Sequence, residues 1–261
     1  MGLFGLGKSK VKEESIDYEG YELKYSSGTS IVERFRRDGS YERDFVDYLN
    51  TDIKKRGSSG AFLDIGANIG MISLSVLKDN PNLQIFAFEP GVHQFDLFKK
   101  TLQINKLENQ IVLSDVALSN EKGTAEFRVH SSADVSGDGF IDTGRAGKTK
   151  SIEVKTDTLD NWWKDNGQLQ IDFIKVDTEG AEYWILQGAK ELLAAQHPVL
   201  YLEINDLNIR NYPFEIKDLF ELIDELNYDL FSLDGVRPTA ENVIDLIREN
   251  DSFVAYYREN D

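Results

Sequence analysis

A short glycine-containing loop is the part of the sequence best suited to bind a ligand. Residues 64–70 read DIGANIG and come directly after a short apolar run. Glycines at a strand-to-helix turn let a ligand approach the backbone closely, and parallel α/β sheets bind ligands at the carboxyl ends of their strands. We therefore predict a nucleotide-type loop that includes Asp64, Gly66, Asn68 and Gly70.

The charge of this loop favours one class of nucleotide over another. A dinucleotide-binding loop has three glycines and presents helix N-terminal amides to a pyrophosphate. This loop has two glycines, and the carboxylate of Asp64 at its start would repel a pyrophosphate. S-adenosylmethionine has no phosphate and carries an ammonium and a cationic sulfonium instead. The loop therefore favours this methyl donor over NAD.

Two acidic residues follow later apolar runs at places that suit a nucleoside. Glu89 ends the second run, about 20 residues beyond the loop, where an acidic side chain accepts hydrogen bonds from ribose hydroxyls. Its alternative role is to stabilise the start of the next helix. Asp115 ends the third run. We predict that it accepts from the adenine amino group while Val116 or Ala117 lies against the ring, although a strand-ending acid can also simply form a turn.

The composition favours one soluble domain in the cytoplasm. With 261 residues and 41% hydrophobic content, the chain can bury one sizeable core. Its formal charge of -17 disfavours nucleic acid and anionic membranes as partners. The densest basic run, residues 54–56, suits a solvated helix end. The absence of cysteine excludes disulfides and thiolate chemistry and fits a reducing compartment.

The order of apolar runs predicts an α/β fold with a doubly wound, mostly parallel sheet and helices on both faces. Short apolar runs alternate with longer amphipathic stretches from residue 61 onward, which is typical of βαβ units. The predicted strands are 61–65, 84–88, 111–113, 171–176, 199–204, 228–233 and 253–257. The main predicted helices are 41–53, 69–78, 181–194 and 215–226.

One segment interrupts this alternation. Two predicted strands, 125–129 and 152–155, flank a stretch rich in Ser, Asp and Gly. Long polar insertions in compact domains are usually functional lids or disordered loops. We predict that residues 131–150 form an acceptor-side lid, that residues 1–38 are an N-terminal extension, and that residues 39–261 form a single domain.

Four segments together resemble the FkbM family of methyltransferases. They read FLDIGANIG at 62–70, FEP at 88–90, VALS at 116–119 and IKVDTEGAE at 174–182. The resemblance runs from about residue 39 to residue 203. It implies a class I methyltransferase (Rossmann-like) fold, S-adenosylmethionine as donor, and methylation of a hydroxyl on a polyketide, sugar or glycan acceptor. Tyr41 and Glu42 also match the family pattern, and the resemblance implies that they close over the methionine end of the donor.

The residues after the fourth strand of the wound sheet are the best catalytic candidates. Asp177 and Glu179 follow that strand and should face the sulfonium, where a carboxylate can orient or deprotonate a hydroxyl. In the alternative interpretation, Glu179 caps the next helix and Asp177 only orders the loop. With Glu203 or Asn205, the two carboxylates would offer oxygen ligands to a divalent metal, which we do not expect to be required.

His130, at the edge of the insertion, is a third candidate because its ordinary pKa suits a general base. The three tryptophans, at 162, 163 and 184, fall within amphipathic stretches and favour core packing over substrate stacking. Two other functions stay open at this point. One is an NAD(P)-dependent oxidoreductase, which the missing third glycine and Asp64 disfavour. The other is a catalytically inactive module that still binds S-adenosylmethionine.

Overall fold

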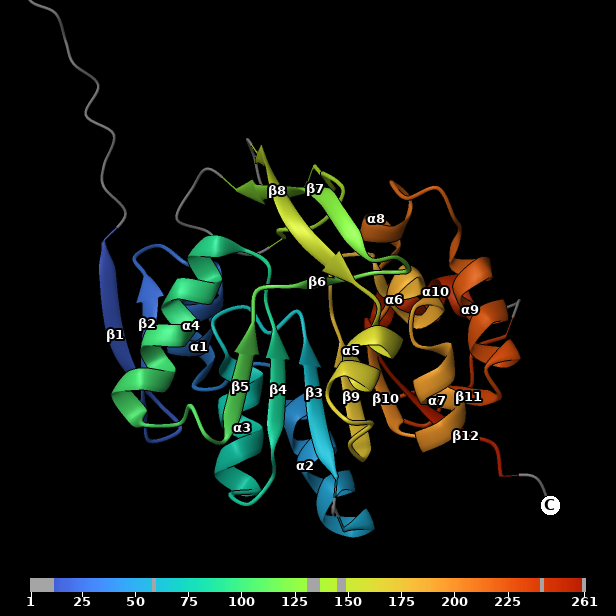
Figure 1. The fold of residues 1–261 in the computed structure, drawn as a ribbon, viewed down its shortest axis with the longest axis horizontal. Coiled ribbons are helices and arrows are strands. Elements are labelled where there is room, and N and C mark those ends of the chain that lie inside the picture. The colour runs from blue at the N-terminus through green and yellow to red at the C-terminus, as the bar shows by residue number, and fades with distance from the viewer. Residues whose placement is uncertain (1–11, 58–59, 131–136, 145–148, 240–241, 260–261) are drawn as a thin grey trace, which may run out of the picture.

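A seven-stranded sheet forms the centre of the molecule in the computed structural model, which describes residues 12–57, 60–130, 137–144, 149–239 and 242–259 (Figure 1). The strand order is β11-β12-β10-β9-β3-β4-β5. All neighbours are parallel except β12, which runs antiparallel to both β10 and β11. The strands are β3 (Ala61–Ile65), β4 (Ile85–Phe88), β5 (Ile111–Ser114), β9 (Ile171–Val176), β10 (Val199–Glu203), β11 (Tyr228–Ser232) and β12 (Ser252–Tyr257).

Helices cover both faces of this sheet. Neighbouring residues of β3 point to opposite faces, so Phe62 joins one apolar core and Leu63 joins the other. The Phe62 core also contains residues of α1 (Ser30–Asp38), α2 (Arg43–Arg56), α3 (Met71–Asp79) and α4 (Val92–Asn105). The Leu63 core contains residues of α5 (Leu159–Asp165), α6 (Glu182–Gln187), α7 (Lys190–Gln196), α9 (Ile216–Glu225) and α10 (Val243–Glu249). The predicted doubly wound α/β fold is confirmed.

The predicted helix over residues 181–194 is wrong in one respect, because the structure divides it into α6 and α7. The break lies at Gly188, where an added Cβ would be 2.2 Å from the carbonyl oxygen of Ser119. This close approach of two backbones excludes a side chain. The carboxylate of Asp160 then accepts hydrogen bonds from the backbone amides of Glu191 and Leu192, so α7 has its own capped start.

The N-terminal region contains structure that we did not predict. Strands β1 (Glu13–Tyr18) and β2 (Tyr21–Ser26) form an antiparallel hairpin, and α1 follows it. The buried Tyr18 hydroxyl lies 2.7 Å from Ser75 Oγ on α3, and Lys24 N donates to Thr101 Oγ1 on α4. These contacts attach the hairpin to the helices that cover one face of the sheet.

A smaller sheet stands above the carboxyl ends of the central strands (Figure 1). It contains β6 (Ala117–Leu118), β7 (Gly123–His130) and β8 (Thr149–Asp157), in the order β6-β8-β7. Of the predicted lid, residues 131–136 and 145–148 lie outside the described residues. Residues 137–144 fold back against β7, since Arg128 and Gly139 exchange two backbone hydrogen bonds.

The tryptophans and the basic run at residues 54–56 agree with two further predictions. Trp163 is 4% exposed and donates to the carbonyl of Leu169, and Trp162 and Trp184 pack against the same core. The basic residues 54–56 lie in the last turn of α2, as expected for a solvated helix end. Within the described part of the chain, no helix is long and apolar enough to cross a membrane.

Candidate active site

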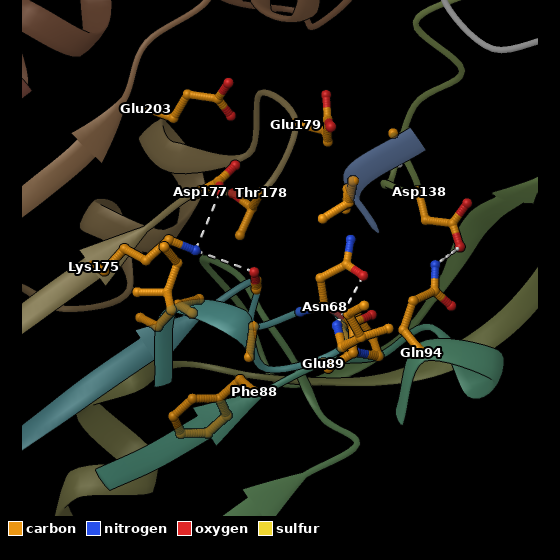
Figure 2. Close-up of a pocket in the computed structure, with 18 of the residues that line it drawn as sticks. Asn68, Phe88, Glu89, Gln94, Asp138, Lys175, Asp177, Thr178, Glu179 and Glu203 are labelled. Atoms are coloured by element: carbon orange, nitrogen blue, oxygen red, sulfur yellow. Dashed lines mark hydrogen bonds and ion pairs between the residues drawn. The ribbon is translucent and has the colours of Figure 1, made fainter. Parts of the chain in front are cut away.

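A cavity of about 320 Å³ lies at the carboxyl ends of β3, β4 and β9, where the strand order reverses direction (Figure 2). This is the point at which open α/β sheets bind ligands. Residues of the glycine loop, the ends of these strands, the N-terminal helices and the insertion all line it. At one end lie Lys175, Asp177 and Glu203, and at the other lie Gln94 and Asp138.

Two glycines of the loop are required for different reasons. Gly66 lines the cavity with φ of +79°, and a Cβ there would lie 1.8 Å from the carbonyl oxygen of Asp177. Asn68 also lines the cavity, in the left-handed region with φ of 51°. Gly70 instead precedes the first residue of α3 and lies against the ring of Phe98. A Cβ added to Gly70 would be 2.1 Å from a carbon of that ring. Gly66 and Asn68 therefore form part of the cavity wall, where Gly66 also admits the Asp177 carbonyl, while Gly70 serves packing.

Asp64 does not lie where we predicted. Its side chain is fully buried, and Oδ2 accepts a hydrogen bond of 2.6 Å from Ser73 Oγ. Oδ1 lies 3.2 Å from the ammonium of Lys175, beneath the glycine loop. The predicted direct contact with the donor is not what this geometry supports, because the carboxylate is directed into the protein and the loop covers it.

Lys175 is a residue whose role we did not predict. It lies in the otherwise apolar strand β9, is 3% exposed, and pairs with Asp64 and Asp177 at 3.2 Å each. It also donates to the carbonyl of Gly66 at 3.2 Å. Burial alone would lower the pKa of Lys175, but the neighbouring carboxylates outweigh burial and raise that pKa above its ordinary value. Lys175 therefore stays charged and ties the glycine loop to β9.

Glu89 lies in the cavity as predicted. It is 6% exposed, and its two carboxylate oxygens accept from the backbone amides of Asn68 at 2.8 Å and Gly91 at 2.7 Å. Burial raises the pKa of Glu89 to about 7, although the two amides lower it. These amides fix the carboxylate at the cavity wall beside Asn68 (Figure 2), where it can accept from a diol. The ribose role stays a prediction.

The adenine-side prediction is corrected at one residue. Asp115 is exposed and is absent from the described cavity wall, whereas Ala117 is buried and lines it. The acid that reaches this end is Asp138, from the insertion. Its carboxylate accepts from Gln94 Nε2 at 2.5 Å and from the amide and ring Nδ1 of His130 at 2.8 and 2.7 Å.

These contacts also bear on His130 as a general base. Its side chain is 4% exposed, its Nδ1 is engaged by Asp138, and it is not one of the described residues that line the cavity. His130 therefore orients Asp138, and nothing in this geometry directs its ring toward an acceptor.

The loop after β9 holds both predicted catalytic carboxylates against the cavity. Asp177 pairs with Lys175, and Glu179 accepts from Asn208 Nδ2 at 2.8 Å. The residue that orders this loop is Glu182, whose Oε1 accepts from Thr178 N, Thr178 Oγ1 and Gly180 N at 2.9, 3.0 and 3.3 Å. The interpretation of Glu179 as a helix cap is therefore wrong, because Glu182 bonds the loop amides and leaves Glu179 at the cavity wall.

Several acids gather beside Asp177. Glu42 and Glu203 line both the main cavity and an adjoining recess of about 100 Å³. Burial, with repulsion from Asp177, raises the pKa of Glu42 to about 7 and that of Glu203 well above its ordinary value. Tyr41 lines the cavity next to Glu42, and burial raises the pKa of its hydroxyl. This end of the site therefore favours cationic groups.

Residues 64–230 match a family described as methyltransferase FkbM domain. The match covers well over half of the sequence and includes the glycine loop, Glu89 and the loop after β9. The chain belongs to the FkbM methyltransferase family.

Relatives of this FkbM methyltransferase carry consistent names. Methyltransferase sdnD from Sordaria araneosa is 28% identical over 199 residues, covering 66% of this chain and 75% of that protein. 2-O-methyltransferase NoeI from Sinorhizobium fredii (strain NBRC 101917 / NGR234) is 26% identical over 175 residues, covering 62% and 70%. A solved structure assigned as a caffeoyl-CoA O-methyltransferase from Staphylococcus aureus has a TM-score of 0.50 at 12% identity, covering 89% and 93%, and shares the class I methyltransferase fold.

The cavity of this FkbM methyltransferase also uses residues outside the family match. Ser30, Arg34, Tyr41 and Glu42 reach it from the N-terminal side. Among the described residues, no group of three or more His, Cys, Asp or Glu side chains is placed to hold a metal ion. Asn205 instead caps α8 (Asp206–Ile209) by accepting from Leu207 N at 2.9 Å.

Proposed function

We propose that this FkbM methyltransferase uses S-adenosylmethionine to methylate a hydroxyl oxygen on a carbohydrate, glycan or polyketide-like small molecule. The observation that carries the donor assignment is Glu89, a buried carboxylate aimed into the cavity by two backbone amides. Oxygen as the acceptor atom is supported by the name of the relative NoeI, a 2-O-methyltransferase. An NAD(P)-dependent oxidoreductase or an inactive module has no comparable support.

The residues present fit S-adenosylmethionine. Glu89 suits the ribose, the carboxylate of Glu42 suits the ammonium, and the carboxylates of Asp177 and Glu179 suit the sulfonium. The absence of a side chain at Gly66 lets the backbone of Asp177 approach the glycine loop, which brings the carboxylate of Asp177 to the cavity beside this loop. A pyrophosphate would meet the same carboxylates and be repelled. The negative charge of the cavity therefore favours binding of S-adenosylmethionine over binding of a dinucleotide.

The protein's part in the reaction is to orient a hydroxyl and accept its proton. S-adenosylmethionine supplies an activated methyl group when it is bound. Asp177, partly exposed and held by Lys175, can accept the hydroxyl proton, and Glu179, fixed by Asn208, can orient the same hydroxyl. Phe140, from the insertion, also lines the cavity and adds an apolar surface to its wall.

We expect Asp177→Asn to lower kcat roughly 100-fold, at the low end for a positioned base because the donor is already activated. The Kd for S-adenosylhomocysteine should change by less than about twofold, since the amide keeps the shape of the carboxylate. Asp96→Asn, at an exposed position of α4, serves as the control. Single-turnover rates with saturating donor would measure the effect, and normal turnover by Asp177→Asn would remove Asp177 from the mechanism.

Donor binding should depend on pH through Glu89. Its pKa of about 7 is raised, so the carboxylate is protonated below pH 7 and can no longer accept from both ribose hydroxyls. Affinity should therefore fall as pH drops below 7, by at most about tenfold per pH unit. 5′-Deoxy-5′-methylthioadenosine, which lacks the ammonium that Glu42 would sense, isolates Glu89. Titration calorimetry with this ligand should show that Glu89→Gln binds it more weakly and that the affinity no longer depends on pH. If Glu89→Gln kept the pH dependence of the unsubstituted protein, a group other than Glu89 would be the one that titrates.

The proposal as a whole is tested by calorimetric titration with S-adenosylmethionine, S-adenosylhomocysteine and NAD in parallel. Binding of the first two without NAD is the expected result, followed by methyl transfer to hydroxyl acceptors. Binding of NAD alone would overturn it. Donor binding without transfer to any glycan, sugar or polyketide hydroxyl would favour the inactive module.

We further propose that residues 39–261 act as the methyltransferase domain and that residues 1–38 are an extension, from which Ser30, Ile31 and Arg34 line the cavity. The acceptor-side lid over residues 131–150 stays a prediction, since Asp138 of this segment lies at the nucleoside end. Small-molecule acceptors suit the enclosed, acidic cavity, and neither nucleic acid nor membrane is proposed as a partner. A cytoplasmic location rests on the cysteine-free composition alone.

A further inference from the structure

Among the described residues, one cation at the cavity makes no hydrogen bond or ion pair. Two basic residues line it, Lys175 and Arg34. Lys175 is fully engaged by Asp64, Asp177 and the carbonyl of Gly66. Arg34 reaches the cavity from α1, is exposed, and makes no hydrogen bond or ion pair within the described ranges of the chain. Its guanidinium is therefore available to a ligand.

The position of Arg34 narrows the kind of ligand. It lines both the main cavity and the recess of about 100 Å³ at the Asp177 end, where Glu42 lies across the same space. Asp177, Glu203 and Asp251 also line the recess, so the guanidinium of Arg34 lies among several carboxylates. Such a recess complements a group that carries an ammonium and, beside it, a carboxylate for Arg34. An α-amino acid head is such a group. A simple anion would be repelled by the surrounding carboxylates, and a simple cation would leave the guanidinium of Arg34 without a counter-ion.

We propose that Arg34 binds the α-carboxylate of the donor while Glu42 accepts from its ammonium. This assignment rests on the proposed use of S-adenosylmethionine, whose methionine end is such a bipolar head. The opposite end of the cavity holds Glu89, Gln94 and Asp138, which suit the nucleoside (Figure 2). A guanidinium presents two parallel N–H groups to a carboxylate, so it fixes the orientation of the amino acid end as well as its charge.

The consequence is that the donor site depends on a residue outside the family match, which starts at residue 64. α1 is held in place by Ile31 and Val32, which are 6% and 0% exposed in the core beside α2 and α3. Arg34 is therefore carried on a packed helix, and its backbone does not have to move for its side chain to reach the recess.

Three ligands separate this role from others. S-adenosylhomocysteine has both charged groups, its decarboxylated counterpart keeps only the ammonium, and 5′-deoxy-5′-methylthioadenosine has neither. In Arg34→Gln, the Kd for S-adenosylhomocysteine should rise roughly tenfold to 100-fold, as expected for loss of a charge-assisted bidentate contact. The Kd values for the other two ligands should change by less than about twofold. Arg34→Lys should recover part of the lost affinity, because it restores the charge without the fork.

Arg37→Gln is the matched control, since Arg37 lies on the same helix and already pairs with Asp38. It should leave all three affinities unchanged. Equal losses for the three ligands in Arg34→Gln would indicate a structural defect and overturn the proposal. An unchanged Kd for S-adenosylhomocysteine in Arg34→Gln would also overturn the proposal. If, in addition, the KM of an anionic acceptor rose, Arg34 would bind the acceptor and not the donor. If the unsubstituted protein bound none of the ligands, the proposed donor itself would be wrong.

Discussion

Gly66→Ala is expected to lower the free energy of unfolding by about 3 to 5 kcal/mol. Of this, about 1 to 2 kcal/mol comes from placing alanine in the left-handed backbone conformation, and the rest comes from overpacking. The added methyl group would lie 1.8 Å from the carbonyl oxygen of Asp177, so the glycine loop and the end of β9 must separate. That separation would also move Asn68 and Glu89, because the amide of Asn68 bonds Glu89. Urea denaturation would give the free energy of unfolding, and calorimetry would show loss of donor binding.

Gly167→Ala provides a control with the same backbone conformation. Gly167 has φ of +73°, but no atom lies within 4 Å of an added Cβ. Only the conformational cost, about 1 to 2 kcal/mol, should therefore remain. If the two variants lost equal stability, the approach of Asp177 to the loop would not be a constraint.

Lys175→Met should lower the free energy of unfolding by about 3 to 5 kcal/mol, the range observed when one partner of a buried ion pair is removed. Methionine nearly conserves the volume, so the main effect is electrostatic. Asp64 is fully buried and would keep only Ser73 as a partner, whereas Asp177 can be solvated from the cavity. Chemical denaturation followed by fluorescence of the tryptophans would measure the change.

The double variant Asp64→Asn/Lys175→Met tests this explanation. Neutralising both partners removes the uncompensated buried charge, so the double variant should be more stable than Lys175→Met alone. Lys164→Met, which removes an exposed pair with Glu191, should leave the free energy of unfolding nearly unchanged. A double variant no more stable than the single one would show that Lys175 acts through packing.

The sequence was most informative where apolar runs and glycines coincide. Strands β3, β4 and β9 were predicted within a residue or two, because strands covered on both faces read as continuous apolar runs. The position of Glu89 at the cavity was predicted because Glu89 comes directly after such a run. The hairpin β1–β2 was missed even though Tyr21, Leu23 and Tyr25 alternate with polar residues, a pattern typical of a half-buried strand.

Apolar runs and glycines in the sequence did not show in which direction individual side chains point. Asp64 and Lys175 lie on adjacent strands, and only the register that pairs them shows that they neutralise each other beneath the loop. A lysine within the apolar strand β9 was a signal of a buried ion pair, although its partner could not be named. Asp138 and Arg34 come from segments far from the motifs, so their arrival at the cavity depends on tertiary packing.

The antiparallel strand β12 has a consequence for how the molecule is made. β11 is joined to the rest of the central sheet through β12, which follows both β10 and β11 in the chain. During synthesis on the ribosome, β10 and β11 therefore emerge with open hydrogen-bonding edges and must wait for residues 252–257 before they can be joined. Such edges invite pairing with other nascent chains. Until β12 emerges, β10 and β11 thus each keep one open edge that the finished fold pairs with β12.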